Sequence, residues 1–160
     1  MNFAPRMLWL MLLAACCGGV QAQQLQTHFE CSATREDDGQ RVLYADSGEI
    51  RIDGSRIEAF HWESALYRRT HGFDCSIDEG DGLHVEVGAA AGSWRVVLGD
   101  ARAARNRRGY DFDHGLDCSI QLERSDDMLQ VTPSCPALCG SRANFSALSV
   151  NLKTGACRYE

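Results

Sequence analysis

Six cysteines, spread over most of the chain, constrain its fold more than any other feature. They stand at positions 31, 75, 118, 135, 139 and 157, and two more, Cys16 and Cys17, lie in an apolar N-terminal segment. In an exported domain, six cysteines are most simply three disulfides, which can pair in fifteen ways. We therefore expect three bridges, each stabilising the domain by about 2–4 kcal/mol, with the pairing left open by the sequence.

The N-terminal segment indicates export. Arg6 precedes an apolar run from Met7 to Ala15, and small residues then continue to Ala22. A basic start, a short apolar core and a small-residue exit are typical of a secretory signal peptide. The run is shorter than the ~20 residues that a transmembrane helix needs. We predict a signal peptide at residues 1–22 and one domain at residues 23–160, located in the periplasm or secreted.

A second processing route would leave the protein on a membrane. Leu13-Ala14-Ala15-Cys16 resembles the lipobox of bacterial lipoproteins, in which the cysteine is acylated. Lipidation at Cys16 would retain Cys17 as an unpaired thiol in an oxidising compartment, whereas cleavage after Ala22 leaves six cysteines that can all pair. We favour the soluble form and keep the lipoprotein anchored through Cys16 as the alternative.

The charge limits the classes of partner. Loss of the signal peptide removes Arg6 and no acid, so the net charge moves from −6 to −7. This balance disfavours nucleic acid, whose phosphates require a basic face. It also disfavours electrostatic docking on anionic lipid, so a membrane is expected only if Cys16 is lipidated. A cationic periplasmic protein is the partner class that fits.

A short pattern around a cysteine occurs three times, at residues 29–33, 73–77 and 116–120, with the cysteines 44 and 43 residues apart. In each copy an apolar residue, an acid, the cysteine and a serine follow one another, and a polar segment then leads into an alternating stretch. We interpret each copy as a hairpin whose cysteine and preceding apolar residue point inward and whose acid and serine point outward. Chance similarity is the alternative.

Further strands and one helix complete the expected fold. Asp53-Gly54-Ser55 predicts a hairpin between residues 49–52 and 56–62. Strands are also expected at residues 93–98, 144–152 and 156–159. Asp100 to Arg108 is the one helical stretch, closed by Gly109. The fold class is therefore all-β, an antiparallel sandwich or small barrel of repeated hairpins with one short helix, stapled by disulfides.

The expected helix carries a cluster of arginines in an otherwise acidic chain, at positions 102, 105, 107 and 108. Guanidinium groups bind carboxylates and phosphates through two parallel hydrogen bonds, so Arg102 and Arg105 are candidate partner contacts. The alternative is a solvated helix face whose arginines offset neighbouring acids.

Metal and thiol chemistry are weaker interpretations. Cys135 and Cys139 form a C-x3-C, one residue longer than the redox motif, and we expect structural disulfides. The acidic segments 36–39 and 78–82 fit hairpin turns better than calcium loops. His71 and His114 precede two of the cysteine patterns without ligand spacing. We predict no metal and no cofactor.

No catalytic motif stands out, and we predict that the protein is not an enzyme. A nucleophile elbow and an HExxH are both absent from the sequence. The leading alternative is a cell-envelope hydrolase that uses two carboxylates among Glu63, Asp111 and Asp113. A structural envelope protein without a small ligand is the third hypothesis.

The signal, size, acidity, β content and cysteines together resemble the periplasmic lysozyme inhibitors of Gram-negative bacteria. Those proteins insert a loop built around Ser-Gly-x-x-Tyr into the lysozyme cleft; the nearest matches here are Ser47-Gly48 and the run from Ser64 to Tyr67. The resemblance implies a non-catalytic binding or inhibitory module. It points to a loop from Glu63 to Tyr67, with Glu63, Ser64 and Tyr67 as contacts.

Overall fold

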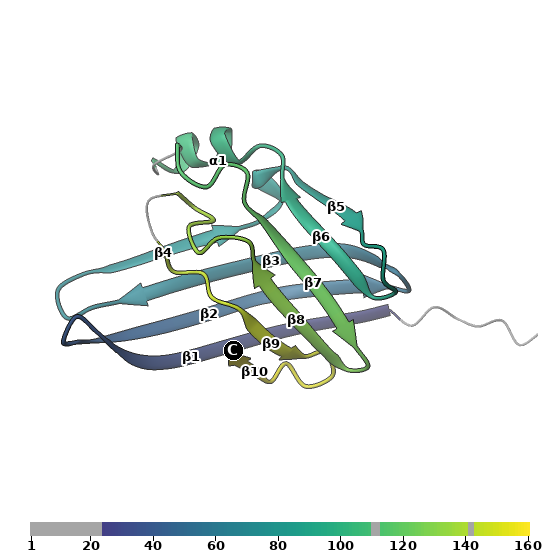
Figure 1. Ribbon diagram of the computed structural model, residues 1–160, viewed down its shortest axis with the longest axis horizontal. Coiled ribbons are helices and arrows are strands. Elements are labelled where there is room, and N and C mark those ends of the chain that lie inside the picture. Colours follow the sequence, from purple (N-terminus) through teal and green to yellow (C-terminus); the bar gives the residue numbers. More distant parts are fainter. Residues whose placement is uncertain (1–23, 110–112, 141–142) are drawn as a thin grey trace, which may run out of the picture.

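The computed structural model describes residues 24–109, 113–140 and 143–160, and these form two antiparallel β-sheets and a short helix (Figure 1). The predicted all-β fold is confirmed. The predicted signal peptide, Cys16 and Asp111 lie outside the described residues. The elements are β1 (Gln24–Asp37), β2 (Gln40–Asp53), β3 (Arg56–Tyr67), β4 (Gly72–Ile77), the 3-10 helix η1 (Glu79–Asp81), β5 (Leu83–Val87), β6 (Ser93–Leu98), α1 (Ala101–Arg108), β7 (Ser119–Ser125), β8 (Met128–Pro133), β9 (Leu148–Asn151) and β10 (Cys157–Tyr159).

Sheet A contains β1-β2-β3-β4 and is built from long hairpins. Asp38 and Gly39 turn β1 into β2, and both have positive φ, as a two-residue hairpin turn requires. β2 turns into β3 after Asp53, as predicted, with Asp53 paired to Arg56. Sheet B contains β10-β9-β8-β7-β6-β5, and its strands cross those of sheet A in Figure 1.

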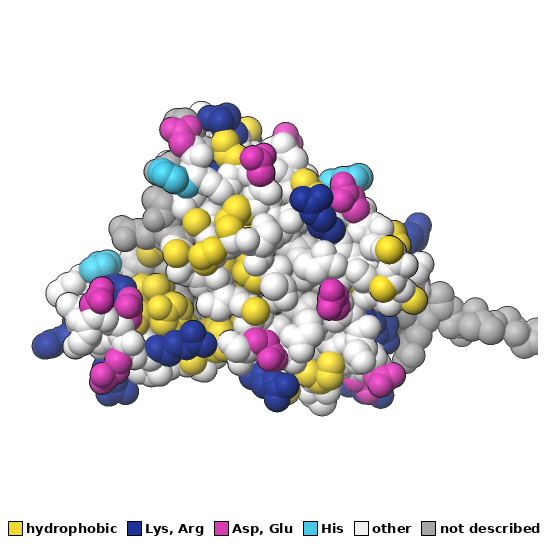
Figure 2. All heavy atoms as spheres, viewed as in Figure 1, with side chains coloured by type: hydrophobic (Ala, Val, Ile, Leu, Met, Phe, Trp, Pro, Cys, Tyr) yellow, Lys and Arg dark blue, Asp and Glu magenta, His cyan; other side chains and the backbone are white. Residues whose placement is uncertain are grey.

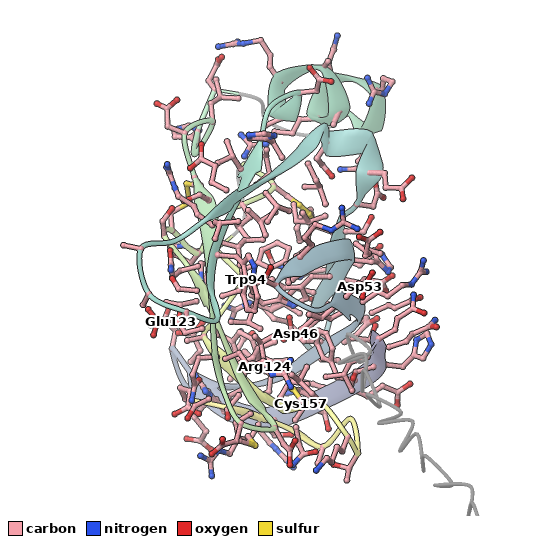
Figure 3. All side chains as sticks on the ribbon, turned by 90° about the vertical axis from the view of Figure 1, so that its right-hand side faces the viewer. Asp46, Asp53, Trp94, Glu123, Arg124 and Cys157 are labelled. Carbon is pink, nitrogen blue, oxygen red and sulfur yellow. A yellow bond between two sulfur atoms is a disulfide. The ribbon has the colours of Figure 1, made fainter. Side chains whose placement is uncertain are left out.

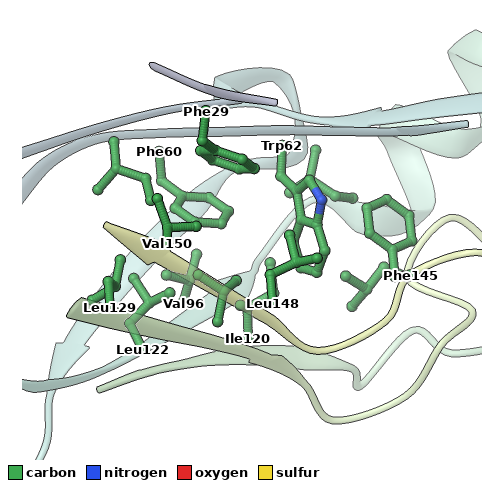
Figure 4. Packing of buried hydrophobic residues seen from close by; sticks show 14 of the residues in the cluster. Phe29, Phe60, Trp62, Val96, Ile120, Leu122, Leu129, Phe145, Leu148 and Val150 are labelled. Carbon is green, nitrogen blue, oxygen red and sulfur yellow. The ribbon is translucent and has the colours of Figure 1, made fainter. Parts of the chain in front are cut away.

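The core lies between the two sheets (Figure 4). Phe29, Phe60 and Trp62 of sheet A meet an aliphatic layer of sheet B that includes Ile120 and Leu122, all of them buried. Sheet A extends beyond sheet B at one end, so part of its inner face has no sheet opposite (Figure 1).

The sheets join along the edge formed by β1 and β10. Glu30 and Ala156 form a parallel β-bridge there, and the Thr27 hydroxyl donates to the Leu152 carbonyl. Gly155 has φ +72°, and a Cβ added to it would lie 2.1 Å from the carbonyl oxygen of His28. Glycine is therefore required for β1 and β10 to approach this closely.

Two of the three cysteine patterns lead into hairpins, β1–β2 and β7–β8, as predicted. The second does not, because β4 lies at the edge of sheet A and β5 at the edge of sheet B, with η1 crossing between them. The predicted orientation also fails in the third copy, where Ser119 is buried and accepts a hydrogen bond from Arg95.

Three disulfides connect parts of the fold that are distant in sequence. Cys31 pairs with Cys157 across the β1–β10 edge, with 5.2 Å between their Cα atoms. The other two bridges join Cys75 to Cys139 and Cys118 to Cys135. The two cysteines of the C-x3-C therefore bind different partners, which makes them structural. Three disulfides are consistent with an oxidising environment outside the cytoplasm.

The expected helix and last strand differ slightly from the observed ones. Gly109 ends α1 in a left-handed conformation, as predicted, whereas the Asp100 side chain makes no capping hydrogen bond. The strand expected at residues 144–152 is confined to β9, because the Phe145 amide donates to the Pro136 carbonyl outside the sheet, while its ring packs edge-on against Trp62 with centroids 4.8 Å apart. β9 then turns into β10 as predicted.

Candidate functional site

The outer face of sheet A carries a row of alternating acid and serine side chains. Glu30, Ser47, Glu63 and Ser76 are register partners on four neighbouring strands. These four side chains project outward because their neighbours along each strand point to the inner face, and successive side chains alternate between the two faces. Figure 3 shows side chains with charged ends projecting from sheet A on the side away from sheet B.

Glu30 and Glu63 are both exposed and flank the smaller Ser47. Neighbouring strands lie about 4.8 Å apart, which places the two Cα atoms roughly 10 Å from each other. Within the part of the chain that the structure describes, neither carboxylate makes an ion pair. The row therefore presents two uncompensated negative charges with room between them for an ammonium or guanidinium group.

Beside this row lie small residues and then an exposed aromatic ring. Ala45 and Ala65 are partners in the next outward row, and Leu43 and Tyr67 are partners in the row after it. The small side chains leave a shallow depression of about 350 Å³ that Glu30, Glu63 and Tyr67 help to line. Tyr67 is 48% exposed and Leu43 is 40% exposed, so the depression has an apolar rim at one end.

A larger depression of about 510 Å³ lies on the same sheet, at Glu49, Arg51 and His61. Two of the three acids that line it are engaged: Glu49 accepts hydrogen bonds from Arg51 at 3.3 Å and from Gln26 at 2.8 Å, and Asp78 pairs with Arg108 at 3.0 Å. The hydrogen bond from Arg51 lowers the pKa of Glu49. Glu79 is the third acid, and the guanidinium of Arg51 in the same lining repels a cation, so the Glu49 depression is a poorer site for a cation than the Glu30–Glu63 row, in spite of its greater volume.

The predicted loop from Glu63 to Tyr67 is wrong. These residues form the end of β3, which pairs with β2 on one side and β4 on the other. Glu63 and Tyr67 point outward, but Ser64 is fully buried and donates to the Asn144 carbonyl at 3.1 Å. The strand therefore brings Glu63 and Tyr67 to one surface and removes Ser64 from it.

The arginines of α1 have mainly structural partners. Arg105 is 1% exposed, and its guanidinium donates to the carbonyls of His114, Gly115 and Leu138. A buried guanidinium cannot contact a partner directly, which is contrary to our prediction that Arg105 is a partner contact. Arg102 is exposed and pairs with Asp113 at 3.3 Å.

The acidic segment 78–82 is a cap that binds α1 and not a hairpin turn. Asp78 and Asp81 form a capping box around η1. Arg108 of α1 pairs with both carboxylates at 3.0 Å, and Asp81 is buried. A calcium ion is not needed to explain the position of these acids, because the Arg108 guanidinium already pairs with both carboxylates.

The remaining catalytic and metal candidates stay dispersed among the described residues. Asp113 lies against Arg102, whereas Glu63 projects from the outer face of sheet A. The described ranges contain no group of three or more His, Cys, Asp or Glu side chains able to hold a metal ion. Within the same ranges, no helix has the length and hydropathy to cross a membrane.

A buried carboxylate that we did not predict lies inside the sandwich. Asp46 is 2% exposed and accepts hydrogen bonds from the Trp62 ring nitrogen at 2.8 Å and the Tyr159 hydroxyl at 2.6 Å. Burial raises the pKa of Asp46, although these hydrogen bonds act in the opposite direction. A sequence signal existed, since Asp46 lies on the inward side of the alternation that includes Val42 and Tyr44.

Comparison of the chain with protein-family models, with curated proteins and with solved structures finds no match.

Proposed function

We propose that this chain is an exported, non-catalytic binding module that docks on a cationic protein through the outer face of sheet A, and that its target is a cell-wall hydrolase of the lysozyme class. The observation that carries the proposal is the pair of uncompensated carboxylates, Glu30 and Glu63, beside the exposed ring of Tyr67. The mature chain is expected to reside in the periplasm or outside the cell.

Charge complementarity supports a basic partner. A lysine or arginine side chain placed over Ser47 would lie between Glu30 and Glu63 and could form charge-assisted hydrogen bonds with both. Such contacts also steer association, because opposite fields raise the encounter rate. The net charge of −6 for the whole chain also favours association with a basic partner.

The shape of the face also suits a protein partner. The outer surface of the four strands covers roughly 700 Å² by strand spacing and rise, close to the ~800 Å² that each partner contributes to a standard interface. Tyr67 supplies an aromatic anchor of the kind that dominates binding energy. The long paired strands hold these groups rigidly, so little conformational entropy is lost on binding.

The first experiment measures binding of the oxidised mature protein to immobilised lysozymes of each known class, together with inhibition of cell-wall lysis. We expect micromolar or tighter binding to at least one class, weakened by added salt. Glu30→Gln combined with Glu63→Gln should lower the affinity at least about tenfold, and Tyr67→Ala should do the same.

The matched control is Glu123→Gln, an exposed acid on β7 in the other sheet. It removes one charge of the same kind and should leave the affinity within about twofold. A loss from Glu123→Gln equal to the loss from Glu30→Gln alone or Glu63→Gln alone would show that only net charge matters. Absence of binding to every lysozyme class at micromolar concentration would overturn the hydrolase target.

A further inference from the structure

A pocket of about 280 Å³ lies on the inner face of sheet A, where the sheet extends beyond sheet B. Tyr44, Leu66 and Phe73 are register partners on β2, β3 and β4 and form its apolar wall. Figure 2 shows hydrophobic side chains gathered on this overhanging face, with charged groups at the edge of the sheet. The pocket faces away from the acidic row, because successive residues of a strand point to opposite sides.

One polar group in the lining lacks a partner. Asn144 is 1% exposed, and its side-chain nitrogen donates to the Ser64 carbonyl at 2.8 Å. A carbonyl only accepts, so this bond fixes the orientation of the amide. The Asn144 Oδ1 atom is buried and accepts no hydrogen bond within the described part of the chain. An unsatisfied buried acceptor costs about 1–3 kcal/mol, and because Oδ1 is covered in this structure, a ligand donor recovers that cost by displacing the side chains over it.

The charges at the rim are already paired. Arg68 forms an ion pair with Asp37, which also lines the pocket. Among the described residues that line the pocket, no Asp, Glu, Lys or Arg side chain is left without an ionic partner, and His71, the other ionisable residue, shares a hydrogen bond with the Thr70 hydroxyl at 3.0 Å. The volume lies just below the usual range for ligand pockets, which limits the ligand to a small group such as a single ring.

We infer that this pocket binds a neutral aromatic group that carries one hydrogen-bond donor, such as a phenol or an indole, with the ring against Tyr44, Leu66 and Phe73 and the donor on Asn144 Oδ1. The site is separate from the proposed lysozyme surface and does not depend on it. The ring gains burial and aromatic contact, and the donor satisfies the amide oxygen.

The test is an NMR titration of the oxidised protein with p-cresol and, as a matched analogue, toluene. We expect p-cresol to bind with a dissociation constant of about 1 mM or tighter and to shift the Asn144 and Phe73 resonances. Toluene lacks the donor and should bind at least about tenfold more weakly. Equal affinity for the two compounds, or no binding of either, would overturn the inference.

Two neighbouring variants localise the binding. Leu66→Arg places a long charged side chain in the pocket and should abolish p-cresol binding. Tyr67→Arg makes the same change one residue later, on the outer face, and should leave p-cresol binding unchanged. An equal loss of p-cresol binding in both variants would show that p-cresol does not bind in this pocket. Binding of N-acetyl-tyrosinamide as well as p-cresol would identify the ligand as a partner's side chain, and binding of p-cresol alone would identify a free small molecule.

Discussion

At the scale of single residues, Asp46 is the most unusual group in the core. It occupies the same inward row as Cys31, Ser64 and Cys75, between two disulfides and with no cation in direct contact among the described residues. Burial, and next the hydrogen bond to Asp46, raise the pKa of Tyr159, which keeps its hydroxyl protonated as a donor. Asp46 lies between the sheets in Figure 3, where water cannot solvate a charge.

The pH dependence of stability should reveal this carboxyl. Because its folded pKa is raised above the unfolded value of about 3.9, its stabilising contribution is present below about pH 4 and is lost as the pH rises through the folded pKa. Asp46→Asn is neutral at every pH. The free energy of unfolding of the wild type, minus that of Asp46→Asn, should therefore decrease from pH 4 upward in urea titrations. A difference that is constant or increases with pH would contradict a raised pKa for Asp46.

At the scale of elements, Arg108 fastens α1 to η1. It pairs with Asp78 and with the buried Asp81, so its loss would leave a buried carboxylate without its cation. Arg102 on the same helix is 61% exposed and pairs with the exposed Asp113. Arg108 and Arg102 are therefore expected to contribute very differently to the stability of the folded protein.

Alanine substitution should separate these roles. We expect Arg108→Ala to lower the free energy of unfolding by about 2 kcal/mol, because a buried charge loses its partner. Arg102→Ala should change it by less than about 0.5 kcal/mol, because exposed ion pairs are weak. Urea unfolding of both oxidised variants measures the difference. Equal effects would show that Arg108 is not a structural clamp.

The elements show why the sequence predicted some features and missed others. Turns at Asp38-Gly39 and Asp53-Gly54 follow from local residue chemistry, and the sequence identified both. The crossover from β4 to β5 depends on partners far along the chain, so the local pattern there suggested a hairpin that does not form.

The candidate site was likewise predicted only in part. Glu63 and Tyr67 belong to the outward surface, but the resemblance to lysozyme inhibitors suggested a loop from Glu63 to Tyr67, whereas strand pairing on both sides holds these residues in β3. Burial of Arg105 could not be foreseen, because carbonyls from residues 114, 115 and 138 satisfy it only in the folded chain. The partnership of Glu63 with Glu30 required the register of three strands.

At the scale of the whole molecule, the disulfides enclose segments of the chain of very different length. Cys31–Cys157 encloses 126 residues and fastens the edge where β1 meets β10, whereas Cys118–Cys135 encloses 17. In the chain-entropy description, a longer closed loop restricts the unfolded state more strongly. The first bridge therefore contributes more to stability than the third.

Paired alanine variants test this difference. Cys31→Ala with Cys157→Ala should destabilise the protein by roughly 2 kcal/mol more than Cys118→Ala with Cys135→Ala. Urea unfolding of the two variants, each with its remaining bridges oxidised, gives the comparison. A larger loss from the shorter loop would show that local packing at residues 115–140 outweighs chain entropy.

Binding of a cationic protein by the outer face of sheet A is the central claim for the whole molecule, and chemical-shift mapping tests it most directly. Isotope-labelled mature protein would be titrated with unlabelled lysozyme of the class that it binds. We expect the largest shifts at Glu30, Ser47, Glu63 and Tyr67, with sheet B unchanged. Shifts concentrated on sheet B or at α1, or no shifts with any lysozyme class, would contradict the account.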